Sequence, residues 1–223
     1  MVKMIVFDMA GTTIDEGNAV YKTVQKVVND GGYAASLDEV LLLGAGKEKL
    51  QAITDILKSK NPDQDVDEEA FQLFQKFKVS LEETYMNLEI KPFSDAENVF
   101  GLLKQKNIKV VLNTGYDYVT ASTLLKKINW KMGREYDALI TADDVKNGRP
   151  APDMILKAMA LFQIINPDEV IKVGDSIVDI EEGKAANCGI VIGVTTGAQT
   201  RKQLNSASPS YVFDNLTALL EII

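Results

Sequence analysis

The second half of the chain alternates between short apolar runs and amphipathic stretches, and this pattern restricts the fold more than any other feature. Apolar runs of the kind that form buried strands lie at 108–112, 138–141, 170–173 and 189–194, with a candidate edge strand at 211–213. Helical patterns lie between them, at about 94–106, 117–128, 152–162 and 177–187, and a last helix is expected from Leu216. Strands that alternate with helices form parallel sheets through right-handed crossovers, so the pattern predicts a doubly wound α/β sheet.

The N-terminus adds one more buried strand, and this strand ends in a carboxylate. Residues 4–7 form a continuous apolar run, as expected for a central parallel strand whose two faces are both covered. Asp8 follows, and the next residues, Ala10-Gly11-Thr12-Thr13, favour a turn. Ligands of open α/β sheets bind beyond the carboxyl ends of the strands, so Asp8 lies where chemistry is expected.

Residues 17–90 are expected to be wholly helical and to form a separate unit. Helical spacing covers 18–30, 47–57 and 67–88, and Ser-x-x-Glu capping boxes begin at Ser36 and, after this unit, at Ser94. The expected organisation is a Rossmann-like, doubly wound parallel-sheet core of residues 1–16 and 91–223. An all-helical cap domain, residues 17–90, is inserted after the first strand.

Composition and charge exclude several classes of function. The net charge of −8 repels nucleic acid and anionic membrane surfaces, and no apolar run approaches the length of a bilayer crossing. Histidine is absent, which excludes histidine-dependent nucleophilic catalysis and histidine metal sites. A metal would have to be held by oxygen atoms, and this favours Mg²⁺ over zinc.

Two further features concern the compartment and the assembly. The only cysteine, Cys188, cannot form a disulfide within the chain, and the strand at Met4 begins too early for a cleavable leader. Both observations favour the cytoplasm. Apolar residues expected to be exposed on the first cap helix, 18–30, would support a homodimer formed through the cap.

Several strand ends bring reactive side chains to the same edge of the predicted sheet. These segments are Asp8, Asn113-Thr114-Gly115, Gly148-Arg149-Pro150, and Gly174-Asp175-Ser176 with Asp179 one turn later. Each segment by itself has a structural explanation, such as a helix cap or a surface charge. Their coincidence at one edge favours a catalytic site.

These motifs, in this order, resemble those of the haloacid dehalogenase superfamily of phosphotransferases, and the resemblance covers nearly the whole chain. It implies that Asp8 attacks phosphorus and forms an aspartyl phosphate. It also implies that Thr114 and Arg149 stabilise the transferring phosphoryl group, and that Thr12 and Gly115 bind the substrate. The inserted helices match the cap of that superfamily.

The same resemblance implies a Mg²⁺ site beside the nucleophile. The expected ligands are the carboxylates of Asp8 and Asp175 and the backbone carbonyl of Ala10. Asp179 is expected behind them, where it would orient the ligands or hold Arg149.

Ala10 departs from the pattern of most phosphatases in the superfamily, which have a second aspartate at this position to protonate the leaving oxygen. The segments 8–13, 114–116, 148–150 and 171–175 resemble instead those of the phosphonatases, the phosphonoacetaldehyde hydrolases of this superfamily. In that family a cap lysine forms a Schiff base with the substrate aldehyde. The leaving group is then an enamine, which needs no acid beside the nucleophile.

Lys47 is the lysine that matches the phosphonatase amine, in Gly44-Ala45-Gly46-Lys47 of the cap. It is predicted either to form the Schiff base or only to bind substrate, because related mutases and phosphatases also have a basic residue here. The phosphonatases have a histidine soon after this lysine, and this chain has none. Burial under the closed cap and the nearby Lys49 could lower the pKa of the Lys47 amine.

Three functions therefore remain open at the level of sequence. The first is a hydrolase that cleaves the carbon–phosphorus bond of a small phosphonate. The second is a phosphomonoesterase similar to phosphoglycolate phosphatase, with Lys47 or a cap tyrosine as the acid. The third is a regulatory module that binds phosphate without catalysis. The natural substrate stays open because the loops of the cap determine it.

Overall fold

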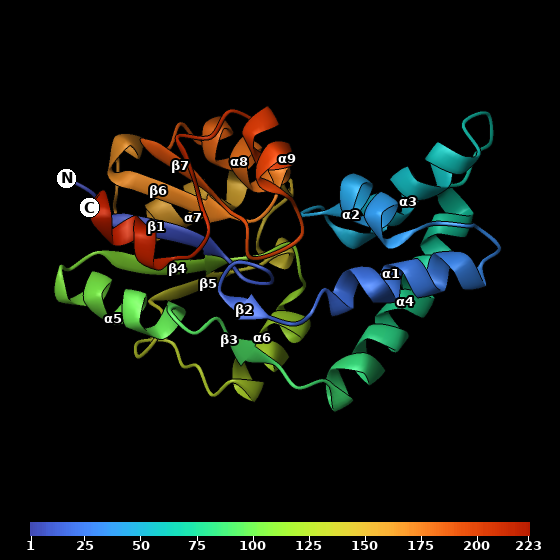
Figure 1. Ribbon diagram of the computed structural model, residues 1–223, viewed down its shortest axis with the longest axis horizontal. Helices are drawn as coiled ribbons and strands as arrows, with labels where there is room; N and C mark the ends of the chain where they lie inside the picture. Colours follow the sequence, from blue (N-terminus) through green and yellow to red (C-terminus); the bar gives the residue numbers. More distant parts are fainter.

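All 223 residues are described by a computed structural model, in which a parallel sheet lies to one side and four cap helices to the other (Figure 1). The sheet has six parallel strands in the order β5-β4-β1-β6-β7-β8. These are β1 (Met4–Asp8), β4 (Lys109–Asn113), β5 (Ala138–Ile140), β6 (Val170–Gly174), β7 (Ile190–Val194) and β8 (Tyr211–Phe213). The predicted Rossmann-like core is confirmed, and β1 lies at its centre between β4 and β6.

Alternate residues of β1 contact helices on opposite faces of the sheet. Ile5 and Phe7 belong to the cluster on the side of α5 (Ala96–Gln105), where the Phe7 and Phe100 rings lie 5.1 Å apart. Met4 and Val6 belong to a second cluster, on the side of α7 (Asp153–Leu161). Both faces of β1 are therefore buried, which explains why its sequence is apolar without alternation.

The other core helices complete the two layers around the sheet. They are α6 (Tyr118–Lys127), α8 (Ile177–Ala185) and α9 (Arg201–Ser206), with short 3-10 turns η1 (Ala142–Asp144), η2 (Pro167–Glu169) and η3 (Thr217–Glu221). The helix expected from Leu216 is thus only a 3-10 turn, and α9 had not been expected. Because α8 begins directly after β6, its N-terminus lies at the carboxyl edge of the sheet.

The cap consists of α1 (Ala19–Asp30), α2 (Leu37–Gly44), α3 (Lys49–Lys60) and α4 (Asp67–Asn87). The predicted capping box of α2 is present, since the Ser36 hydroxyl accepts from the Glu39 amide and the Glu39 carboxylate accepts from the Ser36 amide. The apolar residues of α1, among them Val20, Val24 and Val27, are buried in the same cluster as those of α4. The exposed apolar face on α1 that suggested a homodimer is therefore not found.

A short antiparallel pair joins the two connections between the core and the cap. β2 (Ile14–Asp15) pairs with β3 (Lys91–Pro92), so the chain leaving the core and the chain returning to it lie side by side. Sequence periodicity could not reveal strands of two residues. This pair is the natural joint for any movement of the cap.

The capping box expected at Ser94 is wrong. Helix α5 begins after Asp95, and no side chain caps it. The Asp95 carboxylate accepts from the Thr217 amide instead, and the Glu97 carboxylate accepts from the Trp130 indole. Glu97, the acidic member of the expected box, is thus bonded to a partner distant in the sequence.

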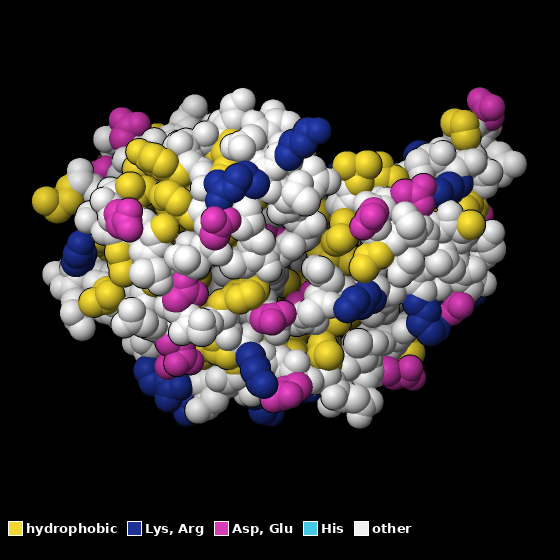
Figure 2. Space-filling view, in the orientation of Figure 1, with side chains coloured by type: hydrophobic (Ala, Val, Ile, Leu, Met, Phe, Trp, Pro, Cys, Tyr) yellow, Lys and Arg dark blue, Asp and Glu magenta, His cyan; other side chains and the backbone are white.

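One face of the molecule carries charges of both signs without a large patch of either, and hydrophobic side chains gather in the notch between the core and the cap (Figure 2). None of the helices combines the length and the apolar composition that a bilayer crossing requires.

Candidate active site

Strand ends meet at the carboxyl edge of the sheet as the sequence predicts. Asp8 ends β1 directly beside Asn113 at the end of β4, and Asp175 follows β6 on the other side. One small pocket is lined by six of the predicted site residues, namely Asp8, Ala10, Thr114, Gly115, Arg149 and Asp175. Residues from four separate segments of the chain are thus brought together at the end of β1.

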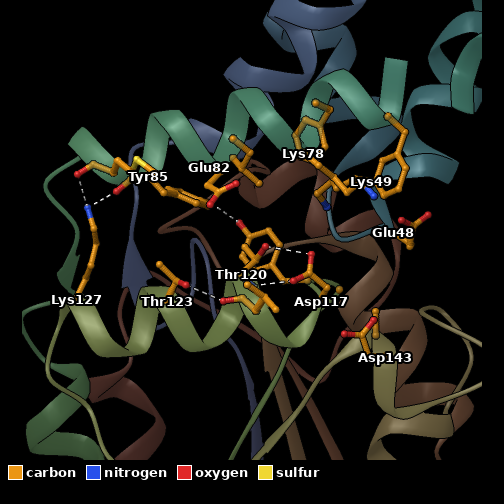
Figure 3. A pocket seen from close by; sticks show the side chains of 18 residues that line it. Glu48, Lys49, Lys78, Glu82, Tyr85, Asp117, Thr120, Thr123, Lys127 and Asp143 are labelled. Atoms are coloured by element: carbon orange, nitrogen blue, oxygen red, sulfur yellow. Dashed lines mark hydrogen bonds between the residues drawn. The ribbon is translucent and has the colours of Figure 1, made fainter. Parts of the chain in front are cut away.

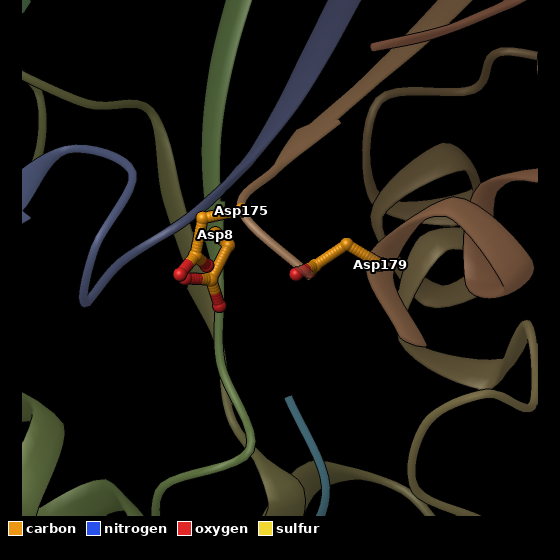
Figure 4. Close-up of side chains that lie close together, drawn as sticks. All are labelled: Asp8, Asp175 and Asp179. Atoms are coloured by element: carbon orange, nitrogen blue, oxygen red, sulfur yellow. The ribbon is translucent and has the colours of Figure 1, made fainter. Parts of the chain in front are cut away.

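Three buried aspartates face one another at the base of this pocket. The carboxylates of Asp8 and Asp175 lie side by side, and Asp179 points toward them from α8 (Figure 4). One oxygen from each lies within 4.8 Å of the others. Burial raises the pKa of Asp8, although Arg149 opposes the shift, and burial with repulsion from Asp8 and Asp179 raises the pKa of Asp175. The cluster is therefore short of positive charge.

Arg149 provides a fixed positive charge beside Asp8. Its Nη1 atom donates to Asp8 Oδ1 at 2.7 Å and lies 3.0 Å from Asp179 Oδ1. Its Nη2 atom donates to the backbone oxygen of Asn113 at 2.9 Å and to the side-chain oxygen at 2.6 Å. Burial would lower the pKa of Arg149, but the surrounding carboxylates raise it, so the guanidinium stays charged.

A second buried cation, Lys172 in the middle of β6, shares the acidic partners of Arg149. Its ammonium donates to Asn113 Oδ1 at 2.7 Å and pairs with Asp179 at 2.9 Å and Glu182 at 3.1 Å. Sequence analysis gave no role to Lys172 or Glu182. The sequence did contain a sign of this cluster, namely a lysine inside an otherwise apolar strand. A lysine that is buried in this way requires acidic partners.

The balance of charge in this cluster fits a divalent cation. Four buried carboxylates, those of Asp8, Asp175, Asp179 and Glu182, surround the two cations Arg149 and Lys172. Two negative charges remain among these six groups when all are ionised, and Asp175 has no cationic partner. Hard carboxylate oxygens at this spacing suit a divalent metal, with Asp8 and Asp175 as the available ligands. Asp179 is already engaged by Arg149 and Lys172.

The structure does not bring Thr12 to the wall of the pocket. Its side chain is fully buried, and its hydroxyl donates to Asp175 Oδ1 at 3.4 Å. The other oxygen of Asp175 accepts from the Ala198 amide. Thr12 therefore contacts the carboxylate of Asp175 rather than the space available to a substrate.

Lys47 also lies outside the pocket, whereas Lys49, two residues later, lines it. The Lys47 ammonium pairs with Asp55 at 2.6 Å, and 32% of its side chain is exposed. Lys49 is only 7% exposed and lines the pocket beside Asp8. Glu48, between the two lysines, is the N-cap of α3, and its carboxylate accepts from two backbone amides of the first turn.

Lys49 remains mainly an ammonium ion at pH 7, but burial makes its free amine more abundant than that of an ordinary lysine. Its ammonium lies 5.3 Å from the centre of the Tyr21 ring and 5.9 Å from that of Tyr116. Burial lowers the pKa of Lys49 to about 8, although Glu48 and Asp8 oppose the shift. At pH 7 about a tenth of such groups are free amines, compared with less than about a thousandth for an ordinary lysine. Lys49 thus has the lowered pKa that allows a lysine amine to act as a nucleophile near neutral pH.

A buried hydrogen-bond chain connects the joint of the cap with the loop after β4. The Tyr85 hydroxyl donates to Glu16 Oε2 at 2.9 Å and bonds the Tyr116 hydroxyl at 3.1 Å. Burial raises the pKa of Glu16 to about 7 although its hydrogen bonds oppose the shift. Sequence analysis missed this chain because its members come from three distant segments.

The cap is closed over the site in this structure. A side chain at Gly46 would overlap the Ser176 hydroxyl, and a β-carbon at Gly115 would lie 3.5 Å from the backbone oxygens of Gly46 and Lys47. The catalytic pocket measures about 20 Å³, which holds little more than one water molecule. The cap must therefore withdraw from the core to admit a substrate.

Comparisons with known proteins agree with this architecture. A family model described as haloacid dehalogenase-like hydrolase matches residues 2–187. A phosphonoacetaldehyde hydrolase from Latilactobacillus sakei is 28% identical over 100% of this chain and 95% of its own length.

Solved structures show the same fold with its helical cap. A phosphonoacetaldehyde hydrolase-like protein from Oleispira antarctica has a TM-score of 0.83 at 24% identity, covering 99% of this chain and 91% of that chain. A predicted phosphoglycolate phosphatase from Haemophilus somnus has a TM-score of 0.79 at 18% identity, covering 99% and 97%. Similarity at these identities establishes a shared fold.

Proposed function

Because this chain belongs to the haloacid dehalogenase-like hydrolases, we propose that it is a Mg²⁺-dependent enzyme that cleaves the carbon–phosphorus bond of a small phosphonate. One observation carries the proposal: the pocket of Asp8 contains a buried lysine amine, Lys49, and has alanine at residue 10. Membership in a hydrolase family also supports an enzyme, and it therefore argues against the third hypothesis, a regulatory module that binds phosphate without catalysis.

In the proposed reaction Asp8 acts on the phosphorus atom. Its carboxylate forms a bond to phosphorus while the bond from phosphorus to carbon breaks, and water then releases phosphate from the aspartyl phosphate. Arg149, the Thr114 hydroxyl and the Gly115 amide would bind the phosphoryl oxygens, and the lining of the pocket by all three residues supports these roles. Mg²⁺, held by Asp8, Asp175 and the Ala10 carbonyl, would offset the charge of the phosphonate and the carboxylates.

Lys49 is assigned the chemistry at the carbonyl carbon of the substrate. Its free amine adds to the carbonyl carbon, water leaves, and the resulting iminium accepts the electron pair of the breaking bond. The product on the lysine is an enamine, which is protonated on carbon and hydrolysed to free the amine. No alkoxide leaves in this sequence, which explains why an alanine at residue 10 is tolerated.

The two cap lysines offer a matched test. Lys49→Arg keeps the charge but cannot form an imine, because the guanidinium stays protonated. Cleavage of phosphonoacetaldehyde, followed as released phosphate, should fall to background, while slow hydrolysis of an aryl phosphate should persist. Lys47→Arg should behave like the wild type on both substrates. Retention of phosphonate cleavage in Lys49→Arg would contradict the assignment.

A phosphomonoesterase is the second candidate, and one observation favours it. Below pH 8 Lys49 is mainly an ammonium ion inside the catalytic pocket, where it could protonate a leaving alkoxide. The two functions differ in the sign of their pH dependence, since an amine nucleophile gains activity as pH rises through about 8 and an ammonium acid loses it. Faster hydrolysis of alkyl phosphates than of phosphonates, with further gain in Ala10→Asp, would favour the esterase.

A further inference from the structure

A second and much larger cavity lies beyond Lys49, between α4 of the cap and α6 of the core (Figure 3). Its volume is about 750 Å³. Lys49, Gly115 and Tyr116 line both this cavity and the catalytic pocket, so the two spaces adjoin at the amine. The cavity persists although the cap is closed over the nucleophile.

The walls of this cavity are mainly apolar. Helix α4 contributes Phe74, Phe77, Leu81 and Met86, and α6 contributes Val119 from the opposite side. Cavities of this size that are lined by aromatic and aliphatic side chains enclose molecules with many more atoms than a two-carbon aldehyde. The apolar walls predict an apolar group on the ligand.

The charged groups around the cavity are largely engaged by the protein itself. Lys127 donates to the carbonyl oxygens at the C-terminus of α4 (Figure 3). Asp117 caps α6, Asp143 accepts from the Tyr118 amide, and Glu48 caps α3. Lys78 and Glu82 of α4 also line the cavity, where Lys78 lies 5.2 Å from the centre of the Phe74 ring, and their charges are opposite. This pair adds no excess of one sign to the walls, which disfavours a multiply charged leaving group.

We propose that the natural substrate is a 2-oxoalkylphosphonate whose carbonyl carries an apolar chain or ring that occupies this cavity. The phosphonate would lie at Asp8 and the carbonyl at Lys49, so the group on the far side of the carbonyl enters the space beyond the amine. The inference rests on the proposed function, since Lys49 must still form the imine. In the overall reaction the substrate and water give phosphate and a methyl ketone. The electron pair of the broken carbon–phosphorus bond forms the new carbon–hydrogen bond of the ketone.

Chain length provides the first test. Phosphate release would be measured with phosphonoacetaldehyde and with 2-oxopropyl-, 2-oxopentyl-, 2-oxoheptyl- and 2-oxo-2-phenylethylphosphonate. Among the alkyl ketones kcat/KM should rise by up to about fourfold for each methylene group that becomes buried. Within this series the ketones with five or seven carbons should exceed the two-carbon aldehyde.

A pair of variants separates the cavity from general effects. Val119→Trp fills the cavity from an exposed position on α6, where folding should tolerate it. It should lower kcat/KM for 2-oxoheptylphosphonate by more than about tenfold, and leave phosphonoacetaldehyde and aryl phosphate unchanged. Val79→Trp is the matched control, since Val79 is exposed on α4 but does not line the cavity.

The outcomes distinguish this inference from the proposed function. If phosphonoacetaldehyde is cleaved better than every longer ketone and Val119→Trp has no selective effect, the substrate class is wrong while carbon–phosphorus cleavage stands. If no phosphonate is cleaved but phosphate monoesters are, the proposed function itself is overturned, and the inference with it.

Discussion

Glu16 is a carboxyl whose burial links protonation to folding. Its pKa is about 7 in the folded protein, compared with an ordinary value of 4.5. The folded state therefore binds more protons than the unfolded state between these values, and this group reduces stability as pH rises from about 4.5 to 7. The difference corresponds to about 3 kcal/mol.

Replacement of Glu16 should remove this dependence. In Glu16→Gln the free energy of unfolding should exceed that of the wild type by a margin that grows by about 3 kcal/mol from pH 4.5 to above pH 7, as measured by urea denaturation. Glu39→Gln is a control with the opposite pH dependence. Hydrogen bonds from Lys60 and Ser36 lower the pKa of Glu39 to about 2, so this carboxylate adds stability that is lost as pH falls from about 4.5 to 2. Parallel profiles for Glu16→Gln and wild type would contradict the account of Glu16.

Residues at the ends of strands could be located from the sequence, whereas those on the cap could not. Asp8, Thr114 and Asp175 converge because parallel strands meet at one edge, whatever the details of their loops. The choice between Lys47 and Lys49 depends on where α3 begins, and a shift of two residues decides which amine enters the pocket. Periodicity does not define helix ends to that accuracy.

At the scale of elements, Gly46 determines how closely the cap loop approaches the core. Its φ is +75°, and a β-carbon there would overlap the hydroxyl of Ser176. Gly32 has a similar φ of +95° but open space around it. Alanine at either position should lower stability by about 1–2 kcal/mol, because both backbones are left-handed.

Only Gly46→Ala should impair catalysis, because only there does the new methyl group keep the cap from closing. Its kcat/KM should fall by roughly a hundredfold, the effect of misplacing reactants by about an ångström. Gly32→Ala should retain wild-type kinetics at a temperature where it is folded. Equal activity in the two variants would contradict a role for close contact between Gly46 and the core.

Elements with strong periodicity were predicted, and elements defined by tertiary contacts were not. The strands of the main sheet and the four cap helices follow from apolar spacing and caps such as Ser36. The β2–β3 joint has too few residues for a pattern. The capping box expected at Ser94 is absent because Glu97 bonds a distant partner, Trp130.

For the whole molecule, the excess of buried negative charge predicts that Mg²⁺ stabilises the fold. At a free Mg²⁺ concentration a hundred times the Kd, the gain should be about 2.7 kcal/mol, or roughly 5–10 °C in Tm. EDTA should reverse it. Asp175→Asn should abolish the shift, whereas Asp168→Asn, an exposed residue before the opposite end of β6, should retain it. No shift in the wild type would contradict the metal site.

The central claim is that Lys49 is the amine that forms an imine with the substrate. The most direct measurement is addition of borohydride to the enzyme with Mg²⁺ and phosphonoacetaldehyde, followed by peptide mass spectrometry. An ethyl or phosphonoethyl group on Lys49, absent from Lys47 and absent when borohydride or substrate is omitted, is the predicted result. Unlabelled Lys49 during active turnover of the phosphonate, or labelling of Lys47 in its place, would contradict the account.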